Sequence, residues 1–186
     1  MAGRGRVIIF PTDTVYGIGC KINDLDGIER IYKIKHRPKE KPLACLCASL
    51  DQIKEIAEVD RISEELIKRF LPGGFTLILK SKEHINKLIG YPTIGVRIPN
   101  HKIALDILNE NGPMLTTSVN ESGAVPLNEY DEIVKEYDAL VDKIYDTNTE
   151  SMNKPSTVVL INDGNVKILR EGPISKEEIE EFLKEI

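Results

Sequence analysis

The sequence predicts a single-domain α/β protein, spanning residues 1–186, in which helices flank one twisted, mixed β-sheet. Strand-sized apolar runs alternate with amphipathic helical segments along the whole chain. No internal repeat, low-complexity tract or linker rich in Pro, Gly or Ser divides it. A chain of 186 residues is also long enough to bury one sizeable core. The order of the strands in the sheet does not follow from the sequence.

Strands are expected where short runs of aliphatic and β-branched residues are bounded by Pro, Gly or polar residues. The first such run, Val7 to Phe10, ends at Pro11. The expected strands cover residues 7–10, 43–47, 76–79, 94–98, 114–118, 156–161 and 166–170.

Helices are expected where apolar residues recur at three- and four-residue spacing behind a capping residue. Asp24, Ser49 and Asn100 are the expected caps of three helices, and Ser175 forms a capping box with Glu178 before the last one. The expected helices run from about residue 25 to 34, 50 to 56, 62 to 70, 101 to 108, 130 to 137 and 176 to 186.

Composition narrows the class of protein. Hydrophobic residues make up 41% and charged residues 30%, and no apolar run is long enough to span a bilayer. The run after Arg4 and Arg6 is too short for a signal peptide, so we expect a cytoplasmic protein. The net charge of −5 argues against a dedicated nucleic-acid binder, and an anionic ligand would need a local basic cluster.

The three cysteines, Cys20, Cys45 and Cys47, favour buried reduced thiols over a metal site, because no CxxC pair or nearby His accompanies them. The three histidines are scattered without metal-ligand spacing. The chain also lacks a GxxxxGK[ST] phosphate loop and the GxGxxG, HExxH and GxSxG motifs.

A basic cluster lies between residues 33 and 41, where all five cations occupy odd positions. Pro38 and Pro42 disfavour helix from His36 onward, and in an extended chain residues two apart share a face. Arg37, Lys39 and Lys41 would then point together, a row that suits a polyphosphate. Taken alone, such a run is more often a solvated surface loop.

Two hydroxyl-rich segments follow strands. Thr12 and Thr14 come directly after the first strand, where α/β folds often bind ligands, although a local Asx-type turn would explain them as well. Residues 116–123 contain four hydroxyls and one amide, which could hold phosphate oxygens or a ribose, or form a turn that ends at Gly123.

Further candidates are single polar residues at strands. Arg97 lies within an apolar strand, where a charge rarely stays buried without a partner, so it should pair with a core carboxylate or with a substrate carboxylate. Ser156 begins a later strand and Arg170 ends the next one. Each of these two is uninformative alone.

Taken together and in order, these segments resemble the YrdC-like family of threonylcarbamoyl-AMP synthases in its short, single-domain form. The resemblance covers residues 7 to about 173. The matching segments are Pro11 to Gly17, Lys35 to Pro38 with Pro42-Leu43, Leu71 to Gly74, Val96 to Pro99 with His101, Ser118 to Asn120 with Ser122-Gly123, Ser156 to Val158, and Arg170 with Gly172.

The resemblance implies a YrdC/RibB-like fold and a reaction. The amine of L-threonine captures bicarbonate or CO2, and the carbamate attacks the α-phosphate of ATP, so that pyrophosphate leaves with Mg2+ support. A downstream transferase then moves the threonylcarbamoyl group to an adenosine of ANN-decoding tRNAs. Weak tRNA binding by this chain would be compatible with that role. Mg2+ would arrive with ATP, without a protein side chain as ligand.

The resemblance also implies which residues act. The reaction set falls on Lys35, Arg37, Ser118 and Asn120, which with Ser156 and Arg170 would bind ATP. The L-threonine pocket would comprise Thr12, Thr14, Tyr16, Arg97 and Thr117. Such chemistry depends on positioning and charge neutralisation more than on a nucleophile, which fits a sequence without an obvious general base.

Two departures and two alternatives stand beside this interpretation. The turn reads LPGG where the family has a WPGP-like turn, and Leu46 replaces a His found in some long members. One alternative is the carbamoyl-transfer domain of hydrogenase-maturation proteins, but this chain lacks the accompanying zinc-finger and acylphosphatase modules. The other is an RNA-binding module, which the acidic charge and 5% aromatic content disfavour.

Overall fold

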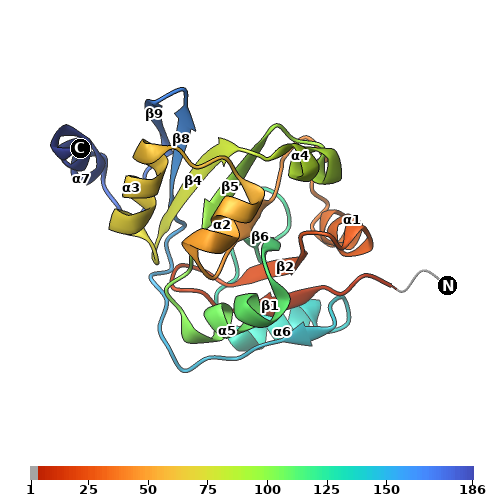
Figure 1. Ribbon diagram of the computed structural model, residues 1–186. Coiled ribbons are helices and arrows are strands. Elements are labelled where there is room, and N and C mark those ends of the chain that lie inside the picture. The colour runs from red at the N-terminus through yellow and green to blue at the C-terminus, as the bar shows by residue number, and fades with distance from the viewer. Residues whose placement is uncertain (1–3) are drawn as a thin grey trace.

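In a computed structural model, which describes residues 4–186, all nine strands form one mixed sheet with helices around it (Figure 1). This confirms the predicted fold class. The helices are α1 (Leu25–Ile34), α2 (Leu50–Ile56), α3 (Arg61–Phe70), α4 (Glu83–Ile89), α5 (Lys102–Asn111), α6 (Tyr130–Tyr137) and α7 (Lys176–Glu185). The strands are β1 (Ile8–Phe10), β2 (Gly17–Lys21), β3 (Ala44–Leu46), β4 (Phe75–Lys80), β5 (Thr93–Arg97), β6 (Met114–Ser118), β7 (Lys143–Ile144), β8 (Thr157–Asn162) and β9 (Asn165–Arg170).

The strand order is β7-β1-β2-β6-β3-β5-β4-β8-β9. Three neighbouring pairs, β1 with β7, β3 with β5 and β4 with β8, are parallel, and the other five pairs are antiparallel. Sequence neighbours are often separated in this order, which is why segments distant in the chain meet on one sheet face.

Helix starts follow the capping chemistry of the sequence. The side chains of Asp24, Ser49 and Ser175 each accept a backbone N–H of the first turn, and Ser175 with Glu178 completes the capping box. The expected cap at Asn100 is wrong. The cap position of α5 is His101, and the backbone N–H of Asn100 instead donates to the carboxylate of Asp13.

The larger core lies on one sheet face, where buried apolar side chains of α1, α2, α3, α4, α6 and α7 form one cluster with alternate strand positions. In β4, for example, Leu77 and Leu79 belong to this core. Thr76 and Ile78 therefore point to the opposite face, because successive side chains alternate across a strand. The three cysteines are free and buried, as the sequence predicted.

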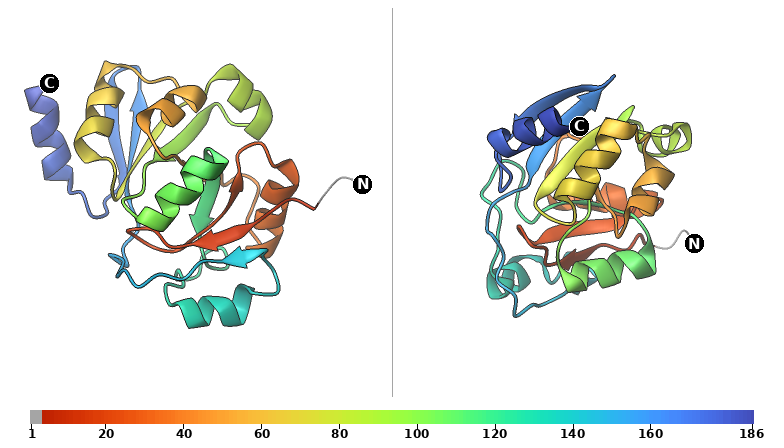
Figure 2. Two further views of the ribbon diagram at one scale, coloured as in Figure 1. Left: turned by 60° about the horizontal axis from the view of Figure 1, so that its bottom comes forward. Right: turned by 60° about the vertical axis from the view of Figure 1, so that its left-hand side comes forward.

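The opposite face is only partly covered. Helix α5 packs there through Ala104, Ile107 and Leu108, against residues of β1, β3 and β6 that include Phe10 and Leu46. In Figure 2, α5 lies apart from α4 and α7 of the larger core. Beyond α5, side chains of β4, β5 and β8 on this face line an open cavity. None of the helices in residues 4–186 has the length and apolar character of a membrane-spanning segment.

Three elements were missed by the sequence analysis: β2, α4 and the two-residue β7. In β2, Gly17 and Gly19 resemble turn residues, but each lies against Thr116 of β6. A Cβ atom at Gly17 would come within 2.6 Å of the Thr116 side chain, and one at Gly19 within 2.8 Å. These glycines thus allow two strands to pack closely.

Candidate functional site

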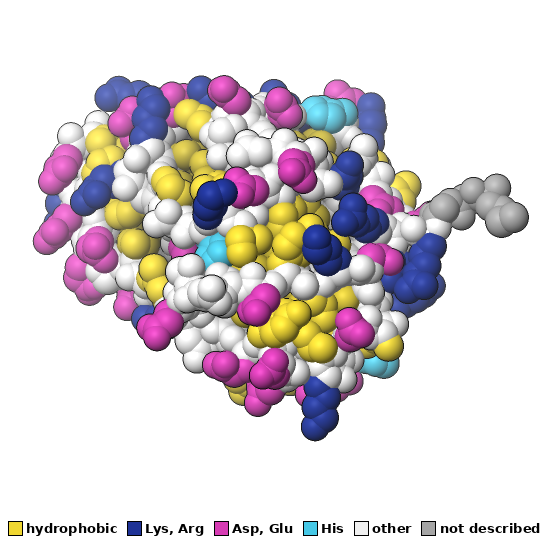
Figure 3. Space-filling model, turned by 90° about the horizontal axis from the view of Figure 1, so that it is seen from below, with side chains coloured by type: hydrophobic (Ala, Val, Ile, Leu, Met, Phe, Trp, Pro, Cys, Tyr) yellow, Lys and Arg dark blue, Asp and Glu magenta, His cyan; other side chains and the backbone are white. Residues whose placement is uncertain are grey.

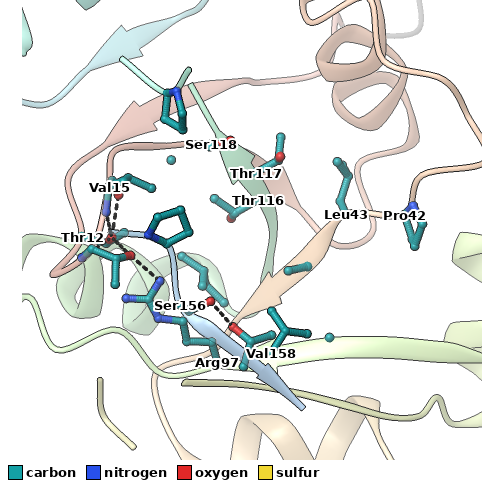
Figure 4. A pocket seen from close by; sticks show the side chains of 18 of the residues that line it. Thr12, Val15, Pro42, Leu43, Arg97, Thr116, Thr117, Ser118, Ser156 and Val158 are labelled. Atoms are coloured by element: carbon teal, nitrogen blue, oxygen red, sulfur yellow. Dashed lines mark hydrogen bonds between the residues drawn. The ribbon is translucent and has the colours of Figure 1, made fainter. Parts of the chain in front are cut away.

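An open cavity of about 400 Å3 occupies the partly covered sheet face (Figure 4). Its walls come from β2, β3, β4, β5, β6, β8 and β9 and from the loops that follow β1, α1, β6 and β7. Nine of the residues predicted from sequence line it: Thr12, Thr14, Tyr16, Arg37, Arg97, Thr117, Ser118, Ser156 and Arg170. The other two, Lys35 and Asn120, lie behind the Ser118 wall.

The charged side chains in the described lining of the cavity are all basic. Arg37, Arg97 and Arg170 line it, and none of the described residues in its lining is Asp or Glu. The rest of the lining is mainly hydroxyl and aliphatic groups. Guanidinium and hydroxyl groups without opposing carboxylates favour an anionic, oxygen-rich ligand.

The segment after α1 is not the extended basic row expected from its prolines. Arg37 points to the cavity, but its guanidinium also donates to the backbone oxygens of Lys41 (3.0 Å) and Pro42 (2.9 Å). Lys39 pairs instead with Glu29 at 2.7 Å. His36 has a left-handed backbone with φ of 49°, which turns the chain after α1. Arg37 is therefore the residue of this row that meets the cavity.

Lys35 is a buried cation without a carboxylate partner among the described residues. Only 1% of it is exposed, and its Nζ donates to the backbone oxygens of Ser118 (2.5 Å) and Asn120 (2.7 Å) and to Asn120 Oδ1 (2.9 Å). Burial first, and the nearby Arg37 second, lower the pKa of Lys35 to about 8. Lys35 thus fixes the loop that follows β6.

Ser118 and Asn120 form one hydrogen-bonded unit. Ser118 Oγ donates to Asn120 Oδ1 at 2.7 Å, and Asn120 Nδ2 donates to the backbone oxygen of Ala124 at 2.7 Å. Ser118 lines the cavity, whereas Asn120 is 9% exposed and supports it from behind. Three members of the predicted reaction set, Lys35, Ser118 and Asn120, are therefore joined by hydrogen bonds, and Arg37 lines the same cavity as Ser118.

Arg97 pairs with a core carboxylate, one of the two alternatives that the sequence left open. Its guanidinium contacts Asp13 Oδ1 (2.5 Å), Thr14 Oγ1 (2.7 Å) and the backbone oxygen of Gly73 (2.8 Å). Arg97 and Asp13 are both buried, and the second oxygen of Asp13 has no hydrogen-bond partner in the described chain. Much of the charge of Arg97 is thus already neutralised inside the protein.

The threonines after β1 satisfy their own turn and face the cavity as well. Thr12 Oγ1 donates to the backbone oxygen of Val15 at 2.6 Å and lies 3.2 Å from Thr14 Oγ1. The backbone N–H of Tyr16 donates to Asn128 Oδ1 at 3.1 Å. The hydroxyl of Thr12 makes the local turn, whereas the carboxylate of Asp13 meets Arg97 and the backbone N–H of Asn100, so the expected Asx-type turn is wrong. The segment is both a local turn and a cavity wall.

The far wall of the cavity adds groups that sequence analysis missed. Thr76 Oγ1 lies 2.7 Å from Ser156 Oγ, and the guanidinium Nε of Arg170 donates to the backbone oxygen of Ser156 at 3.0 Å. Thr93 of β5 lines the cavity too. The available signal was a hydroxyl residue at an outward position of an apolar strand, as for Thr76 in β4.

Figure 4 shows side chains that line the cavity, with Thr116, Thr117 and Ser118 on one side of the open space and Arg97, Ser156 and Val158 on another. The fold and the cavity define an α/β protein with a cavity suited to an anionic ligand on the partly covered face of its sheet.

Comparison with known proteins identifies the family. The model of the Sua5/YciO/YrdC family, described as telomere recombination, matches residues 1–172. The chain belongs to this family, which confirms the resemblance drawn from its motifs. A relative from Methanocaldococcus jannaschii, provisionally named threonylcarbamoyl-AMP synthase, is 36% identical over 175 residues, which cover 93% of this chain and 84% of that protein.

Two solved structures extend the comparison. Threonylcarbamoyl-AMP synthase of Pyrococcus abyssi is 33% identical, and its Sua5 structure in complex with L-threonine superposes with a TM-score of 0.90, covering 98% of this chain and 55% of that one. The chain thus spans about half the length of that relative. Escherichia coli YciO, named as uncharacterised, is 32% identical with a TM-score of 0.84, covering 94% of this chain and 87% of that one.

Proposed function

We propose that residues 1–186 form one catalytic domain that synthesises threonylcarbamoyl-AMP from L-threonine, bicarbonate or CO2, and ATP, with release of pyrophosphate. The observation that carries the proposal is the convergence of three arginines and Ser118 on one cavity, whose described lining contains no Asp or Glu. The names of the relatives and the threonine complex of the Pyrococcus abyssi protein support the choice of substrates.

In the proposed reaction, the threonine amine nitrogen attacks CO2 and loses a proton, which gives a carbamate. A carbamate oxygen then attacks the α-phosphorus of ATP, and the bond to the β-phosphate oxygen breaks, so that pyrophosphate departs. No covalent enzyme intermediate is needed. The protein would act by holding both substrates in line and by neutralising charge.

Arg37 and Arg170 are the proposed phosphate ligands, because both line the cavity without an acidic partner among the described residues. The hydroxyls of Ser118 and Ser156 would bond the nucleotide. Lys35 and Asn120 would act behind them by fixing the loop after β6. Lys35 is thus assigned a positioning role, because its three hydrogen bonds occupy the three N–H groups of an ammonium.

The proposed threonine pocket comprises Thr12, Thr14, Tyr16, Thr117 and Arg97. Three N–H groups of Arg97 are engaged within the protein, so only the remaining ones could meet the threonine carboxylate. ATP would bring Mg2+ as part of the substrate. We propose that phosphate and water oxygens, rather than protein side chains, hold this cation.

The product would be consumed in the cytoplasm by a transferase that modifies ANN-decoding tRNAs. We propose that this chain binds tRNA only weakly, if it contacts tRNA directly. On the face that Figure 3 shows, acidic and basic side chains are interspersed, with Lys and Arg gathered beside the N-terminal end. A mixed surface of this kind offers no continuous basic track for a phosphate backbone.

The test is pyrophosphate release by the purified protein with ATP, L-threonine and bicarbonate. Omission of either threonine or bicarbonate should abolish release. The Arg37→Ala variant should lose at least about tenfold in kcat/KM, since a charge-assisted contact to phosphate is worth about 1.5–3 kcal/mol. Lys39→Ala is the matched control, because Lys39 pairs with Glu29 outside the cavity and its loss should leave turnover unchanged. Equal release without threonine would contradict the substrate assignment.

A further inference from the structure

A second hollow, which we term the acidic cleft, adjoins the cavity. It has a volume of about 650 Å3 and lies between the start of α6 and the loop that joins β7 to β8. Thr12 and Tyr16 line both the acidic cleft and the cavity, so the two spaces share a wall. The proposed function gives this cleft no role.

Four carboxylates line the acidic cleft: Glu129, Asp131, Asp146 and Glu150. All four are exposed, and none forms an ion pair with another residue of the described chain. The described lining contains no Lys, Arg or His. Elsewhere on the surface, carboxylates such as Glu64 and Asp142 do have cationic partners. The cleft therefore holds a concentrated and uncompensated negative charge.

An independent feature also points to a ligand. Tyr16 is 95% buried (5% exposed) and lines the cleft, and its hydroxyl makes no hydrogen bond to any of the residues 4–186. Burial is the main cause that raises the pKa of Tyr16 to about 12, with further contributions from Asp146, Tyr130 and Glu129. The phenol therefore stays protonated at neutral pH, and its hydroxyl lies close enough to Asp146 and Glu129 for their charges to act on it.

The described residues offer no compact metal site here. No set of three or more acidic, His or Cys side chains in the described chain converges closely enough to hold a metal ion. Carboxylates spread along a cleft suit a ligand whose charges are also spread, such as a chain of ammonium or guanidinium groups. The phenol oxygen of Tyr16 can accept a hydrogen bond from an N–H of such a ligand.

We propose that the acidic cleft is a binding site for an extended organic polycation. The same chemistry could come from a free polyamine or from a Lys- and Arg-rich segment of another protein. Nucleic acid is excluded as an occupant, because its phosphates would face four unpaired carboxylates.

The experiment is isothermal titration of the protein, without ATP or threonine, with spermidine and separately with a tetra-arginine peptide at low salt. At least one ligand should bind with one-to-one stoichiometry and lose affinity as salt rises. Binding should weaken at least about tenfold when the cleft is neutralised, as expected for several charge-assisted contacts. The cleft variant carries Glu129→Gln, Asp131→Asn, Asp146→Asn and Glu150→Gln.

The matched control changes net charge by the same amount at exposed carboxylates that have no ion-pair partner in the described chain. It carries Asp163→Asn, Glu177→Gln, Glu181→Gln and Glu185→Gln. Its affinity should stay within about twofold of the parent protein. Tyr16→Phe should weaken binding about threefold or more, through loss of one hydrogen bond to a charged group.

Each outcome of these titrations either supports or overturns the proposal. Binding of spermidine alone would indicate a small-molecule ligand, and binding of the peptide alone would indicate a protein partner. Equal weakening by both quadruple variants would mean that net charge explains the binding and would overturn the proposal. Absence of binding by both ligands at about 1 mM would overturn it too, since charge-assisted contacts of this number should exceed that affinity. Neither result bears on the synthase activity.

Discussion

The burial of the Lys35 ammonium predicts how the free energy of unfolding changes with pH, and the size of this change can be calculated. The ordinary pKa of 10.5 falls to about 8 in the folded protein, because burial removes the ammonium from water and Arg37 lies nearby. Between these two values the unfolded chain binds more protons than the folded one. Stability must therefore rise with pH in this window.

The expected increment follows from linkage. For a group with a folded pKa of about 8 and an unfolded pKa of 10.5, the free energy of unfolding increases by about 1.3 kcal/mol between about pH 7 and pH 9. Below pH 7 the contribution is constant, because the lysine is then protonated in both states. The Lys35→Met variant lacks this titration, and it leaves the backbone oxygens of Ser118 and Asn120 without their donor.

The assay is urea unfolding of the parent protein and Lys35→Met at three pH values across this window. The difference between their unfolding free energies should grow by about 1.3 kcal/mol in favour of the parent protein, since the variant corrects for all other titrating groups. A difference that stays flat, within about 0.3 kcal/mol, would refute the reasoning. It would mean that the three oxygen acceptors restore the ordinary pKa of Lys35.

Two further predictions concern the supports of the cavity. Asp13→Asn leaves the buried guanidinium of Arg97 without a countercharge, so it should lower the free energy of unfolding by about 3–5 kcal/mol in urea titrations. A loss under about 1 kcal/mol would show that Arg97 is solvated. Gly172→Ala should cost about 2–3 kcal/mol by the same measurement, because its Cβ would lie 2.4 Å from the backbone oxygen of Pro155 and 2.5 Å from the backbone nitrogen of Thr157. An unchanged midpoint for that variant would mean that the β8 and β9 ends separate easily.

Local rules predicted most of the elements, because their causes are local. The caps at Asp24, Ser49 and Ser175 form as expected, and the limits of β6 and α6 match the predicted residues. The strand β2 was missed for a non-local reason. Gly17 and Gly19 serve contact with a strand that lies about a hundred residues later in the chain, and a contact of that kind leaves no local pattern.

The sequence predicted most of the residues that meet at the cavity, but it did not predict the contacts that each of them makes. Arg37 was expected to act in a row with Lys39, but the left-handed turn at His36 and the ion pair of Lys39 with Glu29 separate them. Whether Arg97 would pair with a core or a substrate carboxylate could not be decided, because its partner Asp13 is 84 residues away in the chain.

The acidic cleft could not be predicted for a similar reason. Its carboxylates come from two segments, at residues 129–131 and 146–150, and each segment alone resembles an ordinary solvated surface. Only the fold brings them to the same side as Tyr16, which the sequence associated with the other cavity.

The measurement that tests the central claim most directly is mass spectrometry of a reaction containing ATP, L-threonine and isotope-labelled bicarbonate. The proposed function predicts threonylcarbamoyl-AMP with the label in its carbamoyl carbon, and strongly reduced product in Arg37→Ala. Formation of AMP and pyrophosphate without any labelled adenylate, or an equal yield of labelled product in Arg37→Ala, would contradict it.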